Sequence, residues 1–179
     1  MAKKKRECYI LDGYNIIHAW PELRKRSGNL AEARLALVHE MAEYGAFESF
    51  DMMIVFDAMF TEDEGHEEMV NAHTHVIYTR AGETADSRIE RLAYDLVRAG
   101  REVHVVTSDG AEQSVILGAG AYRIPAPAFR KTVRRTQEQL RREFVGKTAA
   151  TLTVARLDVS ERLDAATAAR LDALRKEKD

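Results

Sequence analysis

The sequence predicts an α/β fold, in which helices cover both faces of a central and mainly parallel β-sheet. Short apolar runs of strand length alternate along the chain with longer segments of helical periodicity, an order typical of βαβ units. The apolar runs are continuous, as expected of parallel strands that are buried on both faces. A chain of 179 residues, of which 45% are hydrophobic, suffices for one such domain with a short appendage.

Five segments are predicted to form strands. Four of them are apolar and rich in β-branched or aromatic residues, and the last is weaker. In chain order they are residues 8–11, 53–56, 75–78, 103–106 and 121–124. The segments between them are long enough for helical crossovers, which are right-handed between parallel strands.

Helical patterns occupy several of these intervals. Residues 30–44 place apolar side chains on one stripe after a Gly-Asn start signal. Residues 84–99 repeat apolar side chains at i, i+3, i+4, i+7 and i+8, with Thr84 as the expected N-cap and Gly100 at the end. A third helix is expected between residues 110 and 118.

The C-terminal part of the chain is also predicted to be helical. After Pro125 an apolar and basic helical pattern continues to about residue 147. We therefore expect a domain over residues 1–147 and a C-terminal helical extension over residues 148–179. The last helix is expected over residues 161–176, because residues 158–161 match a capping box.

Several classes of protein are excluded by composition and by missing motifs. No apolar run approaches the roughly 20 residues that span a bilayer, so no membrane partner is expected. The basic N-terminus leads into no secretory leader, and we expect a cytoplasmic protein. The single cysteine, Cys8, excludes disulfides and cysteine-rich zinc sites and is expected to be buried. The absence of a glycine-rich phosphate loop excludes a nucleotide cofactor.

The net charge of −2 hides a strong local asymmetry. Residues 51–70 hold seven acids and no lysine or arginine, whereas residues 130–147 hold seven bases and two acids. The seven bases are Arg130, Lys131, Arg134, Arg135, Arg141, Arg142 and Lys147. This basic segment either meets a polyanion or forms a solvated helix face, and charge alone favours neither interpretation.

Four aspartates fall where the predicted strands end. Asp12 follows the first strand, Asp57 the second and Asp109 the fourth, while Asp86 lies in the first turn of the helix after the third strand. The carboxyl ends of parallel strands share one edge of the sheet, so these carboxylates are expected to converge there. Two like charges about 4 Å apart repel by roughly 4 kcal/mol at an effective dielectric of 20, which favours a bound cation.

The ligand chemistry of this predicted cluster favours Mg²⁺ or Mn²⁺, because its oxygen donors come without histidine or cysteine. Each aspartate taken singly has another interpretation, since Asp is also a common helix cap and turn residue. Asp109 begins an Asp-Gly turn signal, and Asp57 is also placed to cap the following loop. The prediction therefore rests first on Asp12 and Asp86.

Four segments of the sequence resemble one family of nucleases. In order and at suitable spacing, the chain contains YILDGYNIIHAWP, IVFDA, YTRAGETADSRIERL and VVTSDGAEQ. Together they resemble the YacP-like branch of the NYN nucleases, which are relatives of the PIN-domain ribonucleases. The resemblance extends from about Tyr9 through the basic segment. It implies a PIN-like α/β/α fold with an acidic cluster that binds Mg²⁺ or Mn²⁺ and cuts single-stranded RNA.

The resemblance also implies roles for individual residues of this chain. Asp12 and Asp86 correspond to the core catalytic acids, Asp109 to a third and Asp57 to a supporting acid. Asn15 matches the asparagine of the DGYN-type signature and is expected to orient Asp12 or a metal-bound water. Bacterial members of this branch include a ribosome-associated endonuclease that cleaves mRNA in the ribosomal A site, which implies mRNA and the ribosome as partners.

We therefore expect a metal-dependent endoribonuclease that hydrolyses phosphodiester bonds of mRNA in translating ribosomes. Thr107 and Ser108 are placed to position a phosphate or a water by hydrogen bonds. Tyr14 and Trp20 are candidates for stacking on a base, although for Trp20 a role as a core or loop anchor is favoured. The candidate RNA- or ribosome-binding residues are Arg80, Arg88, Arg130, Lys131, Arg134, Arg135, Arg141 and Arg142.

Two other functions stay open at the level of the sequence. One is a non-catalytic RNA- or ribosome-binding module that retains a PIN-like shell. The other is a magnesium-dependent phosphatase that acts on small phosphoesters. Convergence of the four carboxylates argues against the first, and turnover of a generic aryl phosphate would identify the second.

Overall fold

The computed structural model describes residues 6–58, 64–108 and 120–162, with side chains described as far as residue 146. The chain comprises two compact units, Met1–Arg135 and Thr136–Asp179. The first unit contains every described strand and the helices around them. The domain boundary expected at residue 147 stays a prediction.

Six described strands form one sheet in the first unit. They are β1 (Cys8–Asp12), β2 (Asp51–Phe56), β3 (His66–Asn71), β4 (Thr74–Tyr78), β5 (Val103–Val106) and β6 (Tyr122–Ile124). Their order across the sheet is β3-β4-β2-β1-β5-β6, and every neighbouring pair is parallel except β3 and β4. The mainly parallel sheet confirms the predicted fold class, and the five predicted strands are present with bounds within two residues.

β3 is the strand that the sequence pattern did not predict. It lies at the edge of the sheet, pairs only with β4 and is exposed from His66 to Val70. Its sequence, HEEMVN, contains no continuous apolar run, because its side chains on both faces are exposed. A search for apolar runs finds buried strands, so an edge strand with two solvated faces is not found.

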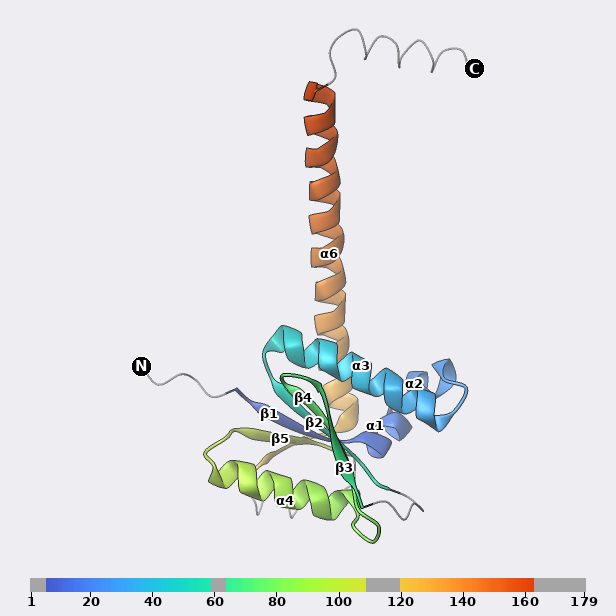
Figure 1. Cartoon of the computed structure of the whole chain (residues 1–179), viewed down its shortest axis with the longest axis vertical. Coiled ribbons are helices and arrows are strands. Elements are labelled where there is room, and N and C mark those ends of the chain that lie inside the picture. The colour runs from blue at the N-terminus through green and yellow to red at the C-terminus, as the bar shows by residue number, and fades with distance from the viewer. Residues whose placement is uncertain (1–5, 59–63, 109–119, 163–179) are drawn as a thin grey trace. The chain divides into compact units, whose positions relative to one another are not determined.

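Helices cover both faces of the sheet, with α3 and α4 on opposite sides of it (Figure 1). The described helices are α1 (Gly13–Ala19), α2 (Pro21–Arg26), α3 (Leu30–Glu48), α4 (Ala85–Arg98) and α6 (Ala126–Arg162). Asn29 caps α3 by accepting from the N–H of Glu32, and Thr84 caps α4 by accepting from the N–H of Ser87. The helices predicted over residues 30–44 and 84–99 are confirmed.

Three other expectations about helices have different outcomes. The helix expected between residues 110 and 118 lies outside the described residues. α1 and α2 were not predicted, because each is too short to show a repeating apolar pattern. The separate start expected at residues 158–161 is wrong, since α6 runs without interruption to Arg162. No proline or glycine occurs between residues 147 and 162, so the sequence holds no strong helix breaker there.

Two apolar clusters hold the helices against the sheet, one on each face. Successive residues of β1 alternate between them, with Ile10 in the cluster under α4 and Leu11 in the cluster under α3. Trp20 lies in the α3 cluster, where its indole Nε1 donates a hydrogen bond to the carbonyl of Ala126 over 2.9 Å. Trp20 is thus an anchor in the core, the favoured of its two interpretations, and the prediction that Cys8 is buried is confirmed. Although α6 is long, no described helix is apolar enough to cross a membrane.

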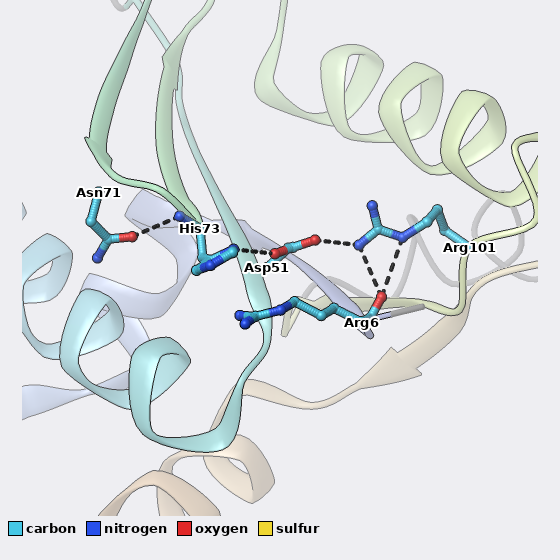
Figure 2. A network of polar contacts seen from close by, with 5 residues as sticks. All are labelled: Arg6, Asp51, Asn71, His73 and Arg101. Carbon is cyan, nitrogen blue, oxygen red and sulfur yellow. Dashed lines mark hydrogen bonds and ion pairs between the residues drawn. The ribbon is translucent and has the colours of Figure 1, made fainter. Parts of the chain in front are cut away.

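A polar network fixes the loops at the amino ends of the strands (Figure 2). Asp51, the first residue of β2, forms an ion pair with Arg101 and lies 3.0 Å from Nδ1 of His73. Arg101 also donates to the carbonyl of Arg6 through Nε and a terminal nitrogen, over 3.2 and 2.9 Å. The β3–β4 turn is closed by a 2.9 Å hydrogen bond from the N–H of His73 to the side chain of Asn71. This amino edge is opposite to the carboxyl edge, where the predicted site lies.

Candidate active site

Asp12 ends the central strand β1 and begins helix α1. Its carboxylate caps the helix, since Oδ1 accepts a hydrogen bond from the N–H of Asn15 over 3.0 Å. The residue is only 8% exposed. A carboxylate buried to this degree costs free energy unless polar groups or a cation surround it. Asp12 is therefore a helix cap, and it also has the burial and the position that a metal-binding acid requires.

Asn15 connects α1 to the segment that follows β5. Its side-chain Oδ1 accepts a hydrogen bond from the N–H of Ser108 over 2.7 Å, while its own N–H is bonded to Asp12. Thr107 is fully buried, and its N–H bonds to the end of β6 over 3.2 Å. The structure thus brings four predicted site residues together at the carboxyl edge. Asp109 lies outside the described residues.

Asp57 and Asp86 both lie at the amino end of α4. Asp57 directly follows β2, and its Oδ2 accepts a long hydrogen bond of 3.4 Å from the N–H of Ala85, the first residue of the helix. Asp86 is the next residue and is exposed. Asp57 and Asp86, which are far apart in the sequence, therefore both lie at the amino end of α4.

The three described aspartates do not form a compact metal-binding group by themselves. Within the described ranges, the group that brings three ligand atoms within 4.8 Å of one another is Glu7, Glu102 and His104. These residues flank the amino ends of β1 and β5, at the opposite edge of the sheet. At the carboxyl edge the predicted donors are carboxylate, amide and hydroxyl oxygens, which fit a hard cation such as Mg²⁺ or Mn²⁺.

The basic residues at the start of α6 fall into two sets. Arg130 and Arg134 both form ion pairs with Glu22 of α2, and the Arg134 pair measures 3.2 Å. Lys131 and Arg135 are exposed, and neither forms an ion pair with a described residue. Residues four apart share a helix face. The first turns of α6 therefore present one paired face and one face whose charges are directed to solvent.

The other basic candidates are Arg80, Arg88, Arg141 and Arg142. Arg80 follows β4 and is exposed, as are Arg141 and Arg142 in the second unit. Arg88 of α4 is half-buried, and its Nε has no hydrogen-bond partner among the described residues. A buried donor without a partner costs about 1–3 kcal/mol, which a bound phosphate oxygen would recover.

Three further side chains, which were not predicted from the sequence, lie at the carboxyl edge near Tyr14 or Tyr78. Arg34 of α3 donates a hydrogen bond to the hydroxyl of Tyr14 over 3.2 Å. Tyr78 and His66 stack on each other at the same edge of the sheet. Burial raises the pKa of Tyr78, and Arg34 opposes that shift. Tyr78 ends a predicted strand, and an aromatic residue at a strand end is the sequence signal by which it could have been identified.

Comparison with known proteins decides the family. The family profile described as the YacP-like NYN domain matches residues 9–176 of the chain. The chain belongs to the YacP-like NYN family. The resemblance based on the four sequence motifs is thereby confirmed.

Relatives of this YacP-like NYN chain occur in Bacillus subtilis. YacP of strain 168 is 37% identical over 137 residues, which cover 76% of this chain and 80% of that protein. A crystal structure of a Rae1 (YacP) mutant from the same species matches with a TM-score of 0.69 and 36% identity, covering 79% of this chain and 83% of that one. A second crystal structure of Rae1 (YacP) matches with a TM-score of 0.65 and 34% identity, covering 87% and 91%.

Membership of the YacP-like NYN family has a direct consequence for function. It indicates a nuclease of RNase type, with RNA as the substrate class. PIN-like nuclease domains typically use divalent metal ions, and the oxygen donors at the carboxyl edge fit such ions.

Proposed function

We propose that this chain is a metal-dependent endoribonuclease that hydrolyses phosphodiester bonds of single-stranded RNA. Its proposed substrate is mRNA in the A site of translating ribosomes. The proposal rests on the carboxylates at the carboxyl edge, where Asp12 is buried at the end of the central strand and Asp57 and Asp86 lie at the amino end of α4. A module that only binds RNA has no need for carboxylates gathered at one edge.

The proposed ligands of Mg²⁺ or Mn²⁺ are Asp12, Asp86 and Asp109, with Asp57 as a supporting acid. When bound, a divalent ion supplies Lewis-acid activation of the attacking water and neutralises charge on the scissile phosphate. Asn15 contributes by position, because its N–H fixes one oxygen of Asp12. Its side-chain Oδ1 accepts a hydrogen bond from the backbone N–H of Ser108 and so holds the segment after β5 to α1.

Three further residues are proposed to orient the reacting groups. Thr107 and Ser108 lie at the end of β5 and would position a phosphate or a water through their hydroxyls. The Nε of Arg88, for which the described part of the chain offers no acceptor, would donate to a phosphate oxygen. In-line attack by water leaves a 5′-phosphate and a 3′-hydroxyl on the two products.

The decisive experiment maps new 5′ ends by primer extension on an mRNA that is translated in a purified system containing Mg²⁺. The wild-type chain is compared with Asp86→Asn and with Asp95→Asn, which is the same substitution at an exposed position further along α4. Naked mRNA serves as the second control. We expect cuts with the wild-type chain and Asp95→Asn and none with Asp86→Asn, because only Asp86 lies at the predicted site.

Each outcome separates one candidate function from the others. Cuts confined to translated mRNA support the full proposal, whereas equal cuts on naked mRNA retain the nuclease and remove the ribosome from its mechanism. Undiminished cutting by Asp86→Asn contradicts the site. If nothing is cut but ribosomes are bound, the chain is a binding module, and if only a generic aryl phosphate is hydrolysed, it is a phosphatase.

A further inference from the structure

A row of aromatic side chains follows the carboxyl edge of the sheet. Tyr14 meets Phe56 edge to face, with ring centroids 5.2 Å apart. Phe56 stacks on Tyr78 at 5.8 Å with an interplanar angle of 25°, and Tyr78 stacks on His66 at 4.5 Å and 24°. The aromatic row, defined by these four residues, therefore extends from α1 across β2 and β4 to the edge strand β3.

The aromatic row and the acidic residues of the proposed site come from neighbouring positions in the sequence at the carboxyl edge. Tyr14 is two residues after Asp12 in α1. Phe56 is the last residue of β2 and immediately precedes Asp57. The rings and the carboxylates thus come from the same strand ends, so a nucleotide next to the scissile phosphate would lie within reach of the row.

Accessibility changes along the aromatic row from its middle to its end. Phe56 is fully buried, whereas Tyr14 and Tyr78 are half-buried. The side chain of His66 at the end of the row is 52% exposed although its ring lies against Tyr78. Core packing accounts for the buried ring of Phe56. The exposed imidazole of His66, on an edge strand, leaves aromatic surface on which a further ring can stack.

Two arginines lie next to the aromatic row. Arg34 donates to the hydroxyl of Tyr14 over 3.2 Å. Arg80 packs closely against the turn before β3, since a Cβ added at Gly65 would lie 2.9 Å from its Cγ. Gly65 also has a φ of +73°, which favours glycine at this turn. Aromatic faces next to guanidinium groups are the combination with which proteins bind single-stranded RNA.

We propose that the aromatic row, exposed at its His66 end and supported there by Tyr78, is a stacking platform for a base of single-stranded RNA that flanks the cleaved phosphate, with Arg34 as the neighbouring phosphate-binding cation. The proposal rests on the proposed nuclease function for its choice of ligand. It assigns a binding role to three residues, Arg34, His66 and Tyr78, none of which was a candidate site residue from the sequence.

The charge of β3 determines which part of the nucleotide the platform receives. Glu67 and Glu68 are exposed on this strand, and Glu68 lies 3.1 Å from Nε2 of His66. Carboxylates here repel a phosphate, so the sugar-phosphate backbone cannot follow β3 closely. A neutral base can lie on the exposed ring of His66, which Tyr78 supports, while its phosphates are directed toward the arginines.

The test measures binding of a short, fluorescently labelled single-stranded RNA by anisotropy, in the Asp86→Asn background so that the RNA stays intact. A second RNA of equal length carries abasic nucleotides. We expect His66→Ala and Tyr78→Ala to weaken binding of the normal RNA by roughly 5- to 150-fold and to leave binding of the abasic RNA unchanged. Tyr78→Phe retains the ring and should bind like the parent.

Matched controls separate stacking from folding and from charge. Tyr94→Ala removes an exposed tyrosine of α4, on the other face of the sheet, and should have no effect. Arg34→Gln should weaken binding of both RNAs and lower the salt slope by roughly 1, because it removes a phosphate contact. His66 lies on an exposed edge strand, so His66→Ala is the variant that tests stacking with the least risk to the fold.

The platform is overturned if His66→Ala and Tyr78→Ala bind the normal RNA like the parent. It is also overturned if they weaken both RNAs equally, or if the parent binds neither RNA. Cleavage by the wild-type chain alongside unaffected binding by these variants would retain the nuclease and reject the platform. Base-dependent binding without any cleavage by the wild-type chain would retain the platform and reject the nuclease.

Discussion

Gly13 occupies the position between the buried acid Asp12 and the rest of α1, where no larger residue fits. A Cβ at this position would overlap the ring of Phe56, which is itself fully buried. Because the aromatic row begins here, the ring has little freedom to move away. The close approach of α1 to β2 thus depends on one missing side chain.

We expect Gly13→Ala to lower the free energy of unfolding by about 1–3 kcal/mol, the usual cost of overpacking a core. The matched control is Gly146→Ala in α6, where an added Cβ has no neighbour within 4 Å. There the better helix propensity of alanine should raise stability by about 0.5–1 kcal/mol. Urea denaturation of both variants checks the difference, and similar effects in the two would contradict the steric argument.

At the site, the positions of the acidic residues could be predicted from the sequence, whereas the contacts between side chains could not. The strand-end pattern placed Asp12 and Asp57 at one edge of the sheet, and the structure places both there. The hydrogen bond from Ser108 to Asn15 joins residues 93 positions apart and depends on a side-chain rotamer. Nothing in a linear pattern specifies such a contact, so the connection could not be predicted.

At the scale of elements, the basic residues in the first turns of α6 differ in whether they form ion pairs within the fold. Glu22 pairs with Arg130 and Arg134 and so joins α2 to the first turns of α6. Lys131 and Arg135 are left on a solvent-exposed face. From the sequence these four bases could not be distinguished, because an ion pair between residues more than 100 positions apart leaves no local pattern.

We expect a double reversal, Lys131→Glu with Arg135→Glu, to weaken binding to ribosomes and to lower the slope of log affinity against log salt by roughly 2. Co-sedimentation with ribosomes over a range of salt concentrations measures both quantities. The control is Arg91→Glu with Arg98→Glu on α4, which changes the net charge equally on the opposite face of the sheet. Equal losses in the two double variants, or none, would show that the exposed face of α6 is not a specific contact.

The buried strands could be predicted from the sequence, whereas the exposed strand could not. The central strands are mostly apolar, since both of their faces are covered. β3 was missed because it has no covered face, and α1 was missed because seven residues are too few to show a period. The capping box at residues 158–161 failed for the opposite reason: a local signal was present, but the helix had already begun at Ala126.

At the scale of the whole molecule, the buried tyrosines of the α3 cluster link stability to pH. Burial raises the pKa of Tyr44 to about 12 and raises that of Tyr9 as well, because the phenolate is poorly solvated there. In the unfolded chain both groups titrate near 10. Between pH 10 and 12 the unfolded chain therefore binds fewer protons than the folded chain, and stability must fall as the pH rises.

We expect the urea midpoint to decline steeply as the pH rises above 10. Below pH 10, tyrosine ionisation should change the midpoint little. Tyr44→Phe removes one of the titrating groups, so its decline over the same range should be shallower. Circular dichroism in buffered urea series from pH 8 to 11 measures both curves. A midpoint that stays constant above pH 10, or an identical decline in the variant, would contradict the assignment.

The central position of β1 has a consequence for the synthesis of the chain. Its first neighbour, β2, is translated about 40 residues later, and its second, β5, about 95 residues later. At roughly 5–20 residues per second, β1 waits about 5 to 20 s for that second neighbour. During this time one row of its backbone hydrogen-bonding groups is unpaired, as in an exposed edge strand. β1 is therefore well protected in the finished sheet, yet during synthesis its backbone groups stay unpaired on one side until β5 has been translated.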